Sequence, residues 1–194
     1  MRKNVKKQLA LRVLSTAALM AMVSSIATAA FADTYDLNKG SVTVETRDDG
    51  ITYVTQKDAE INEHPDTTGV TITSNGTQTS NTITVETADK QTTNVTLENV
   101  HIEQPDSHWS GNTDPAPIEI KGNGNTNLEL NGNNTVFSGN EDHAGIEKAD
   151  VNGTGTLTIK DDVNDDGSEK TGTEADTTGK LVAGGFYNGA AIGG

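Results

Sequence analysis

The chain has 194 residues and a formal net charge of −14 at pH 7. Residues 1–32 hold five basic residues and no acidic one, so the remaining 162 residues have 9 basic and 28 acidic groups, a formal charge of −19. This charge excludes nucleic-acid binding by phosphate neutralisation and disfavours other polyanions. Aromatic residues make up only 4%, while Thr, Asn and Gly together exceed a third. A single domain of this composition needs a core of small aliphatic side chains.

Residues 1–32 have the pattern of a secretory signal peptide. A basic segment ends at Arg12, an apolar stretch spans residues 13–30, and Ala30-Phe31-Ala32 before Asp33 matches a small-x-small cleavage site. An uncleaved N-terminal membrane anchor is the alternative. No second hydrophobic run follows, so we expect no membrane span after cleavage. The expected location is secreted or extracellular, with cell-wall attachment as an option.

Cysteine is absent from the chain. The exported fold therefore depends on neither a disulfide framework nor a Cys-ligated metal. This combination of export and no cysteine is typical of bacterial secretion, and it favours a Gram-positive source.

Apolar residues after residue 33 alternate with polar ones in short runs, separated by Gly, Asn and Asp. Period-two alternation with β-branched residues indicates β-strands, and no helical period exceeds two turns. Gly and Asn at the intervals suit tight corners. The predicted inward residues are Val42/Val44, Ile51/Tyr53, Val70/Ile72, Ile83/Val85, Val95/Leu97, Val100/Ile102, Ile118/Ile120, Leu128/Leu130, Val136, Ile146, Leu157/Ile159, Leu181/Ala183 and Ile192.

An internal repeat separates the possible all-β folds. Ala116-Pro117-Ile118-Glu119 recurs 28 residues later as Ala144-Gly145-Ile146-Glu147, and again 46 residues further as Ala190-Ala191-Ile192-Gly193. Removing the acidic, apolar-poor stretch 161–178 from the second interval restores a spacing of 28. Three short strands per repeat of about 28 residues match one coil of a parallel β-helix. An antiparallel sandwich is the alternative.

The predicted fold class is therefore an all-β, right-handed parallel β-helix with inserted acidic loops. Handedness follows from the general preference for right-handed parallel crossovers. We expect a signal peptide at 1–32, an N-terminal cap or first rungs at 33–80, and β-helix rungs at 81–194 with insertions at 104–115 and 161–178. An unclosed last coil would expose strand edges. We therefore expect an incomplete fragment of a longer coil.

Several strand and turn motifs resemble a known group of proteins. They include residues 35–44, Ser80-Asn81-Thr82-Ile83-Thr84-Val85, residues 94–102, Gly153-Thr154-Gly155-Thr156-Leu157-Thr158-Ile159 and the closing Asn188-Gly189-Ala190-Ala191-Ile192-Gly193-Gly194. These resemble repetitive β-helix surface-protein modules of gut-dwelling Gram-positive bacteria, which are pectate-lyase-like, carbohydrate-binding or adhesin-like. The resemblance spans nearly all of residues 34–194 and implies a non-catalytic surface module. It transfers no active-site residue, and the 161–178 insertion departs from the simpler modules.

The acidic insertion contains a candidate calcium loop. Asp162, Asn164, Asp166 and Ser168 offer oxygen ligands at alternate positions, and Gly167 supplies the bend of a D-x-N-x-D-G pattern. Thr173 stands where an EF-hand has its bidentate Glu, and no helices flank the loop. A solvated acidic loop is the alternative, so calcium is the candidate cofactor and no other cofactor is expected.

A loop bounded by Pro105 and Pro115 contains the only Trp of the chain. Trp109 with Asp106, His108 and Asn112 suits carbohydrate binding, because an aromatic ring stacks on pyranose CH groups while polar groups bind hydroxyls. The alternative is that the Trp ring covers the apolar stack.

The residues on the predicted strand faces give little support to catalysis. Lyases on β-helices need a basic proton abstractor, and hydrolases need clustered acids. Arg47 is the only arginine after residue 32, and the four histidines have no metal-triad spacing. We therefore expect a non-enzymatic adhesion or carbohydrate-binding module whose partner is a glycan, a host surface or a cell-wall component. The alternatives are a polysaccharide lyase or hydrolase with catalytic rungs beyond Gly194, and a structural spacer.

Overall fold

The structure is a computed structural model that describes residues 33–106, 115–149, 153–161 and 178–194. Ala32–Gly194 form one compact unit, and every buried core side chain belongs to it. The described residues form fifteen β-strands and two single-turn 3₁₀ helices, and contain no α-helix. The all-β class predicted from the sequence is therefore confirmed.

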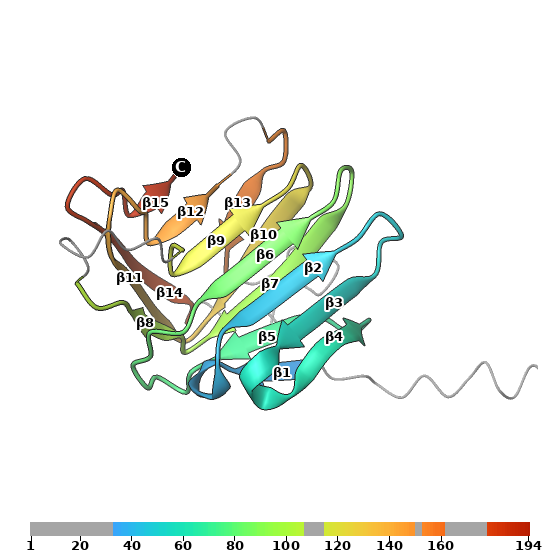
Figure 1. Ribbon diagram of the computed structural model, residues 1–194, viewed down its shortest axis with the longest axis horizontal. Helices are drawn as coiled ribbons and strands as arrows, with labels where there is room; N and C mark the ends of the chain where they lie inside the picture. The colour runs from blue at the N-terminus through green and yellow to red at the C-terminus, as the bar shows by residue number, and fades with distance from the viewer. Residues whose placement is uncertain (1–32, 107–114, 150–152, 162–177) are drawn as a thin grey trace, which may run out of the picture. The chain divides into compact units, whose positions relative to one another are not determined.

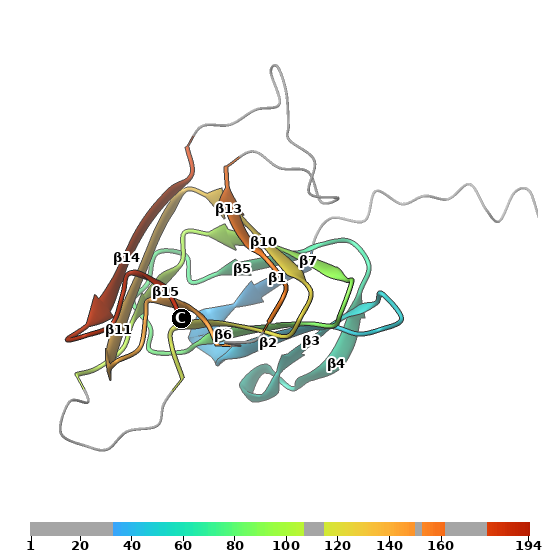
Figure 2. The ribbon, with the colours of Figure 1, turned by 90° about the horizontal axis from the view of Figure 1, so that it is seen from above.

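The strands form three sheets around a common core (Figures 1 and 2). The five-stranded sheet contains β1 (Asp33–Asp36), β5 (Val70–Thr73), β7 (Thr92–Glu98), β10 (Asn125–Asn131) and β13 (Leu157–Lys160), in that spatial order. The three-stranded sheet contains β14 (Lys180–Phe186), β11 (Asn133–Glu141) and β8 (His101–Glu103). The seven-stranded sheet contains β15 (Ile192–Gly193), β12 (Ile146–Lys148), β9 (Ile118–Lys121), β6 (Ile83–Thr87), β2 (Val42–Thr46), β3 (Thr52–Gln56) and β4 (Ile61–Asp66).

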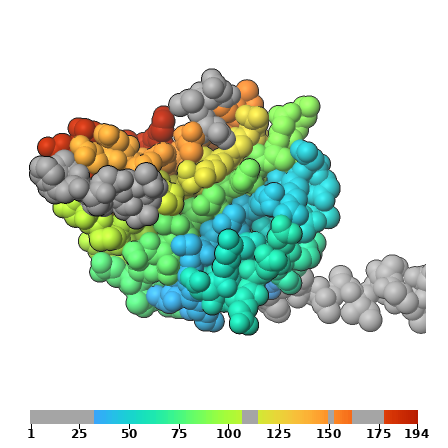
Figure 3. All heavy atoms as spheres, viewed as in Figure 1, coloured from blue at the N-terminus to red at the C-terminus, as the bar shows by residue number. Residues whose placement is uncertain are grey.

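From β6 onward the chain visits the three sheets in a fixed order. Strands β6, β7 and β8 lie in the seven-, five- and three-stranded sheets, and the next two sets of three strands repeat this order before β15 returns to the seven-stranded sheet. Each strand pairs in parallel with the strand three places later. In Figure 3 these segments form successive bands of colour, from green to red.

The strand register confirms the alignment expected from the repeat. Ile118 is paired with Ile146, and Ile146 with Ile192, so the three tetrapeptide copies occupy neighbouring strands. Ile83 continues the same column on the other side of Ile118. Ile83, Ile118 and Ile146 are fully buried, whereas Ile192 is 46% exposed. The core is thus built from columns of aliphatic side chains contributed by successive parallel strands.

The N-terminal part departs from this regular order. Strands β2, β3 and β4 pair antiparallel, so the seven-stranded sheet is mixed. Two 3₁₀ helices, η1 (Leu37–Lys39) and η2 (Lys57–Ala59), connect these strands to their neighbours. Apolar alternation did not predict β1 or β4, which lie at sheet edges and contain mostly polar residues.

The predicted inward pair Ile51/Tyr53 is wrong. Ile51 precedes β3 and is 38% exposed, while Val54 and Gln56 of this strand are buried. The amide Nε2 of Gln56 donates to the backbone oxygens of Asp36 (2.7 Å) and Gly40 (2.8 Å). This polar side chain satisfies carbonyl groups inside the fold, so the inward residues of β3 are Val54 and Gln56, in the opposite phase to the predicted pair.

A cluster of threonine hydroxyls lies inside one corner of the fold. Thr93 Oγ1 donates to Thr46 Oγ1 at 2.6 Å, and Thr87 Oγ1 lies 2.7 Å from Thr93 Oγ1 and 3.3 Å from Thr126 Oγ1. All four side chains are buried. The hydroxyls satisfy one another, so the corner can exclude water without leaving a polar atom unpaired.

Candidate functional site

Most residues of the two predicted sites lie outside the described part of the structure. This applies to Trp109, His108 and Asn112 of the carbohydrate site. It applies equally to the whole calcium set, which comprises Asp162, Asn164, Asp166 and Ser168. Asp106 is described, and it is an exposed residue shortly after β8. The structure does describe both ends of the 104–115 segment, at Gln104 and Pro115.

Gln104 holds the two ends of this segment together. Its backbone N–H donates to the carbonyl oxygen of Phe137 in β11 (3.1 Å), and its side-chain Nε2 donates to the carbonyl oxygen of Pro115 (2.9 Å). The residue is only 9% exposed. The segment that contains Trp109 therefore leaves and re-enters the fold at one fixed point.

The other side-chain atom of Gln104 has no hydrogen-bond partner. Among the described residues, its Oε1 is the one buried side-chain N or O atom left unpaired. If the side-chain amide of Gln104 were flipped, its oxygen would face the carbonyl oxygen of Pro115, and two acceptors cannot form a hydrogen bond. The orientation with Nε2 toward Pro115 is therefore correct, and Oε1 is the unpaired atom. An unpaired buried acceptor costs about 1–3 kcal/mol.

A small hollow of about 260 Å³ adjoins Gln104; we call it the Gln104 hollow. Its lining is Ser41, Ser80, Thr82, Gln104, Pro105, Pro115 and Asn140. No lining residue is charged, and the lining consists of hydroxyl and amide side chains and two proline rings. Such a lining fits a neutral, hydroxylated ligand of about the size of one sugar ring.

Residues far apart in sequence meet in the Gln104 hollow because the parallel register stacks their strands. Ser41 precedes β2 and Thr82 precedes β6, and these two strands are neighbours. Ser41 Oγ accepts from the backbone N of Thr82 (3.0 Å) and lies 3.3 Å from Thr82 Oγ1. Pro115 precedes β9, the next strand of the same sheet. The hollow thus lies where successive strands enter the seven-stranded sheet.

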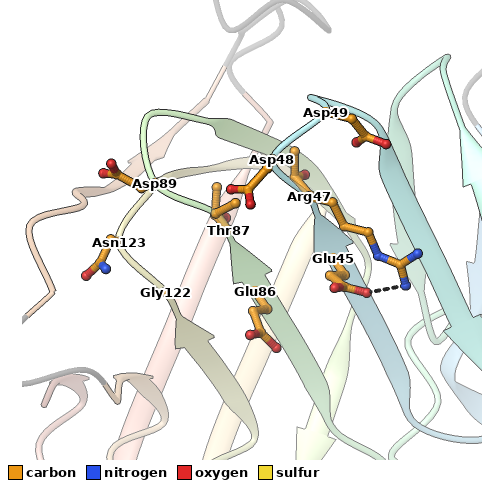
Figure 4. A pocket seen from close by; sticks show the side chains of 11 residues that line it. Glu45, Arg47, Asp48, Asp49, Glu86, Thr87, Asp89, Gly122 and Asn123 are labelled. Atoms are coloured by element: carbon orange, nitrogen blue, oxygen red, sulfur yellow. Dashed lines mark hydrogen bonds and ion pairs between the residues drawn. The ribbon is translucent and has the colours of Figure 1, made fainter.

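A larger groove of about 550 Å³ lies at the opposite ends of these strands (Figure 4). The lining comes from the last residues of β2 and β6 and from the corners that follow β2, β6 and β9. It includes five carboxylates and one guanidinium: Glu45, Asp48, Asp49, Glu86, Asp89 and Arg47. We call this surface the acidic groove.

Arg47 offsets only part of the charge of the acidic groove. Its Nη2 lies 2.7 Å from Glu45 Oε2 and 2.9 Å from Glu63 Oε1, and these hydrogen bonds raise the pKa of Arg47 above its ordinary value. Its guanidinium carbon lies 4.2 Å from the centre of the Tyr53 ring, so it also covers one face of that ring. The groove therefore remains acidic and repels anionic ligands.

Close backbone contacts shape the acidic groove. The N–H of Ala88 donates to Thr46 O (2.9 Å), and the N–H of Gly124 donates to Thr87 O (3.0 Å), so successive corners stack on one another. Gly122 has φ +85°, and a Cβ there would overlap the carbonyl oxygen of Thr87. Only glycine fits this position.

The described histidines contact carboxylates singly. His143 Nδ1 lies 2.8 Å from Glu147 Oε2, His64 Nε2 lies 3.4 Å from Asp33, and His101 Nε2 lies 3.7 Å from Glu103. Within the described ranges, no group of three or more His, Asp or Glu side chains is arranged to hold a metal ion. The calcium site predicted in the 161–178 insertion stays a prediction.

Sequence reasoning missed Gln104, Ser41 and Thr82 as site residues. Their only signal was position: Gln104 directly precedes the loop proline, and the other two directly precede strands.

Comparison with known proteins gives no match: no family model, no curated protein and no solved structure resembles the chain. No helix in the described residues is long and apolar enough to span a membrane. The assignment of a function therefore depends on the site geometry and the sequence patterns.

Proposed function

We propose that this chain is a secreted or cell-surface carbohydrate-binding module built on a right-handed parallel β-helix, without catalytic activity. The fixed order in which the chain visits three sheets supports the β-helix, because each strand pairs with the strand three places later. Right-handed crossovers are the general rule for parallel strands. The basic and apolar segments of residues 1–32 support export.

One observation supports carbohydrate binding more than any other: the uncharged hollow beside Gln104, which is lined by hydroxyl and amide side chains and two prolines. Sugar hydroxyls donate and accept hydrogen bonds, so they can pair with the Ser, Thr and Asn groups of the lining. The prolines offer CH surfaces that pack against a pyranose ring. Trp109, in the segment that Gln104 closes, is the proposed stacking residue, with Asp106, His108 and Asn112 as polar contacts.

Charge restricts the class of glycan. The acidic groove and the formal charge of −19 outside residues 1–32 oppose uronic-acid or sulfated polymers. The proposed ligands are therefore neutral glycans of a host or cell-wall surface. We also propose membership of the Gram-positive β-helix surface-protein group that the strand motifs resemble.

The test is a glycan-binding titration of the unit Ala32–Gly194 with a Ser80→Phe variant. Ser80 lines the Gln104 hollow and is exposed, so a phenyl ring there should fill the hollow without disturbing the core. Thr77→Phe is the matched control, because Thr77 is also exposed and lies outside the hollow. We expect Ser80→Phe to abolish binding to neutral glycans and Thr77→Phe to leave it unchanged.

Two other outcomes would overturn the proposal. Binding that is equal in both variants would place any glycan site elsewhere. Absence of glycan binding by the folded wild-type unit would leave the structural spacer as the better function. A hydrolase or lyase would instead release reducing ends or unsaturated sugars from the same glycans.

A further inference from the structure

The outer face of the three-stranded sheet carries an exposed aromatic side chain. Phe137 lies on β11, the central strand of this sheet, and is 37% exposed. Its neighbours Val136 and Ser138 are buried, so Phe137 occupies the outward phase of the strand. Because β11 pairs with β8 on one side and with β14 on the other, this exposure is not the result of an open sheet edge.

A glycine on the neighbouring strand makes room for the ring. Phe137 is paired with Gly184 of β14, and a Cβ at Gly184 would overlap the ring at Cδ1 and Cε1. The ring therefore leans over the β14 backbone, in the space that a larger residue would fill. This packing restricts the ring before any ligand arrives, which lowers the entropy lost on binding.

Polar side chains lie beside Phe137 on the same face. The strand register places Glu103 of β8 next to Phe137, and the preceding row of positions contains His101, Thr135 and Val182. Val182 is 55% exposed, and His101 Nε2 lies 3.7 Å from Glu103 Oε2. We call these five residues the Phe137 surface. It combines exposed apolar groups with a hydroxyl, an imidazole and a carboxylate.

This combination fits a neutral glycan better than a purely apolar partner. An aromatic ring packs against the CH groups of a pyranose, while hydroxyl, imidazole and carboxylate groups bind its hydroxyls. An apolar partner would instead cover the imidazole and the carboxylate without offering them hydrogen bonds, which is costly. The formal charge of −19 outside residues 1–32 opposes anionic polymers.

The Phe137 surface adjoins the Gln104 hollow through the backbone. Gln104 directly follows Glu103, and its N–H donates to the carbonyl oxygen of Phe137 at 3.1 Å. Glu103 is exposed on the outer face of the sheet, whereas Gln104 lines the hollow. Consecutive strand residues are only about 3.3 Å apart. A glycan longer than the single ring that the hollow accommodates can therefore contact both surfaces.

We infer that the Phe137 surface is a second contact for the glycan: Phe137 stacks on a sugar unit of the neutral chain whose other unit occupies the Gln104 hollow. Thr135 and His101 supply hydrogen bonds to that stacked unit. The inference rests on the proposed function, because it takes the same glycan and adds a contact. It predicts that affinity rises with the length of the glycan, since a single sugar reaches only the hollow.

Calorimetric titration of the unit Ala32–Gly194 with a neutral monosaccharide and with its oligosaccharides of increasing length tests the inference. We expect the affinity of the wild type to rise with length. Phe137→Leu should weaken binding of the longest chain about tenfold and leave binding of the monosaccharide unchanged. Leucine keeps an apolar side chain beside Gly184, so a purely structural role of Phe137 predicts no such dependence on length.

Two further variants separate stacking from stability. Phe137→Tyr keeps the ring and should retain the binding of long chains. Gly184→Ala keeps Phe137 but displaces its ring, so it should weaken the binding of long chains. Circular dichroism of each variant establishes that the fold is intact.

Ile51→Ala is the control, because Ile51 is 38% exposed and directly precedes β3, away from the three-stranded sheet. We expect it to bind glycans of every length as the wild type does. An affinity that is independent of length, an equal loss for the monosaccharide and the longest chain in Phe137→Leu, or no loss in that variant would each overturn the inference alone. Absence of glycan binding by the folded wild-type unit would refute the proposed function together with the inference.

Discussion

The isoleucine column of the seven-stranded sheet gives the sharpest stability prediction. Ile118 and Ile192 occupy equivalent register positions on either side of Ile146, yet Ile118 is fully buried and Ile192 is 46% exposed. Truncating each to alanine removes the same atoms from two environments. The comparison therefore isolates the effect of position in the stack.

The expected magnitudes follow from burial. Ile118→Ala removes side-chain atoms that pack between two neighbouring isoleucines, so it should lower the free energy of unfolding by about 4 kcal/mol. Ile192→Ala loses about 1 kcal/mol, because half of its side chain already faces solvent. For a domain of this size these losses correspond to roughly 8–16 °C and 2–4 °C in Tm.

Urea unfolding followed by far-UV circular dichroism measures both losses, with Glu119→Ala as the control. Glu119 directly follows Ile118 on β9 but is partly exposed and forms a 2.8 Å ion pair with Lys121, so its loss should cost under about 1 kcal/mol. Equal destabilisation by Ile118→Ala and Ile192→Ala would refute the unequal burial of these two side chains. A larger effect of Glu119→Ala than of Ile118→Ala would refute the inward assignment of the column.

Three further predictions concern pH, a corner and calcium. Burial and neighbouring carboxylates raise the pKa of Tyr35 above its ordinary value. Because Tyr35 then ionises at lower pH in the unfolded chain than in the folded one, the free energy of unfolding should fall as the pH rises above about 10. Urea titrations at a series of pH values should show a smaller fall for Tyr35→Phe. At Gly122 a Cβ would have positive φ and would also overlap the preceding corner, whereas at Gly76 it would have positive φ and open space. In the same unfolding assay, Gly76→Ala should lower the free energy of unfolding by roughly 1 kcal/mol and Gly122→Ala by at least twice as much. If the insertion binds calcium, added calcium should raise Tm, and a chelator should reverse the increase. The Asp162→Ala/Asp166→Ala double variant should show no increase. An increase that persists in this variant would contradict the predicted ligands.

Local alternation predicted the regularly repeated strands well because most of their inward residues are aliphatic. Ile118, Ile146 and Ile192 were aligned from the sequence repeat, and the strand register confirms that alignment. The prediction failed at β3, where Gln56 points inward and Ile51 outward. Apolar alternation does not detect a polar residue that is buried to satisfy backbone carbonyls.

The candidate site was less accessible to sequence reasoning than the fold. Gln104, Ser41 and Thr82 come from three separate segments, and only the parallel register brings them together. The unpaired state of Gln104 Oε1 is a property of the packed fold, because it follows from the Pro115 carbonyl that its Nε2 already binds. Gln104 forms no motif with its sequence neighbours, so the sequence alone does not mark it as a site residue.

Calorimetric titration of the wild-type unit Ala32–Gly194 and its Gln104→Leu variant, with the neutral glycan selected by an array screen, tests the central claim most directly. Gln104→Leu removes both the unpaired acceptor and the link to Pro115 while keeping a side chain of similar volume. The account predicts saturable binding by the wild type and at least a tenfold loss in the folded variant. Undiminished binding by Gln104→Leu, or binding of anionic glycans in preference to neutral ones, would contradict it.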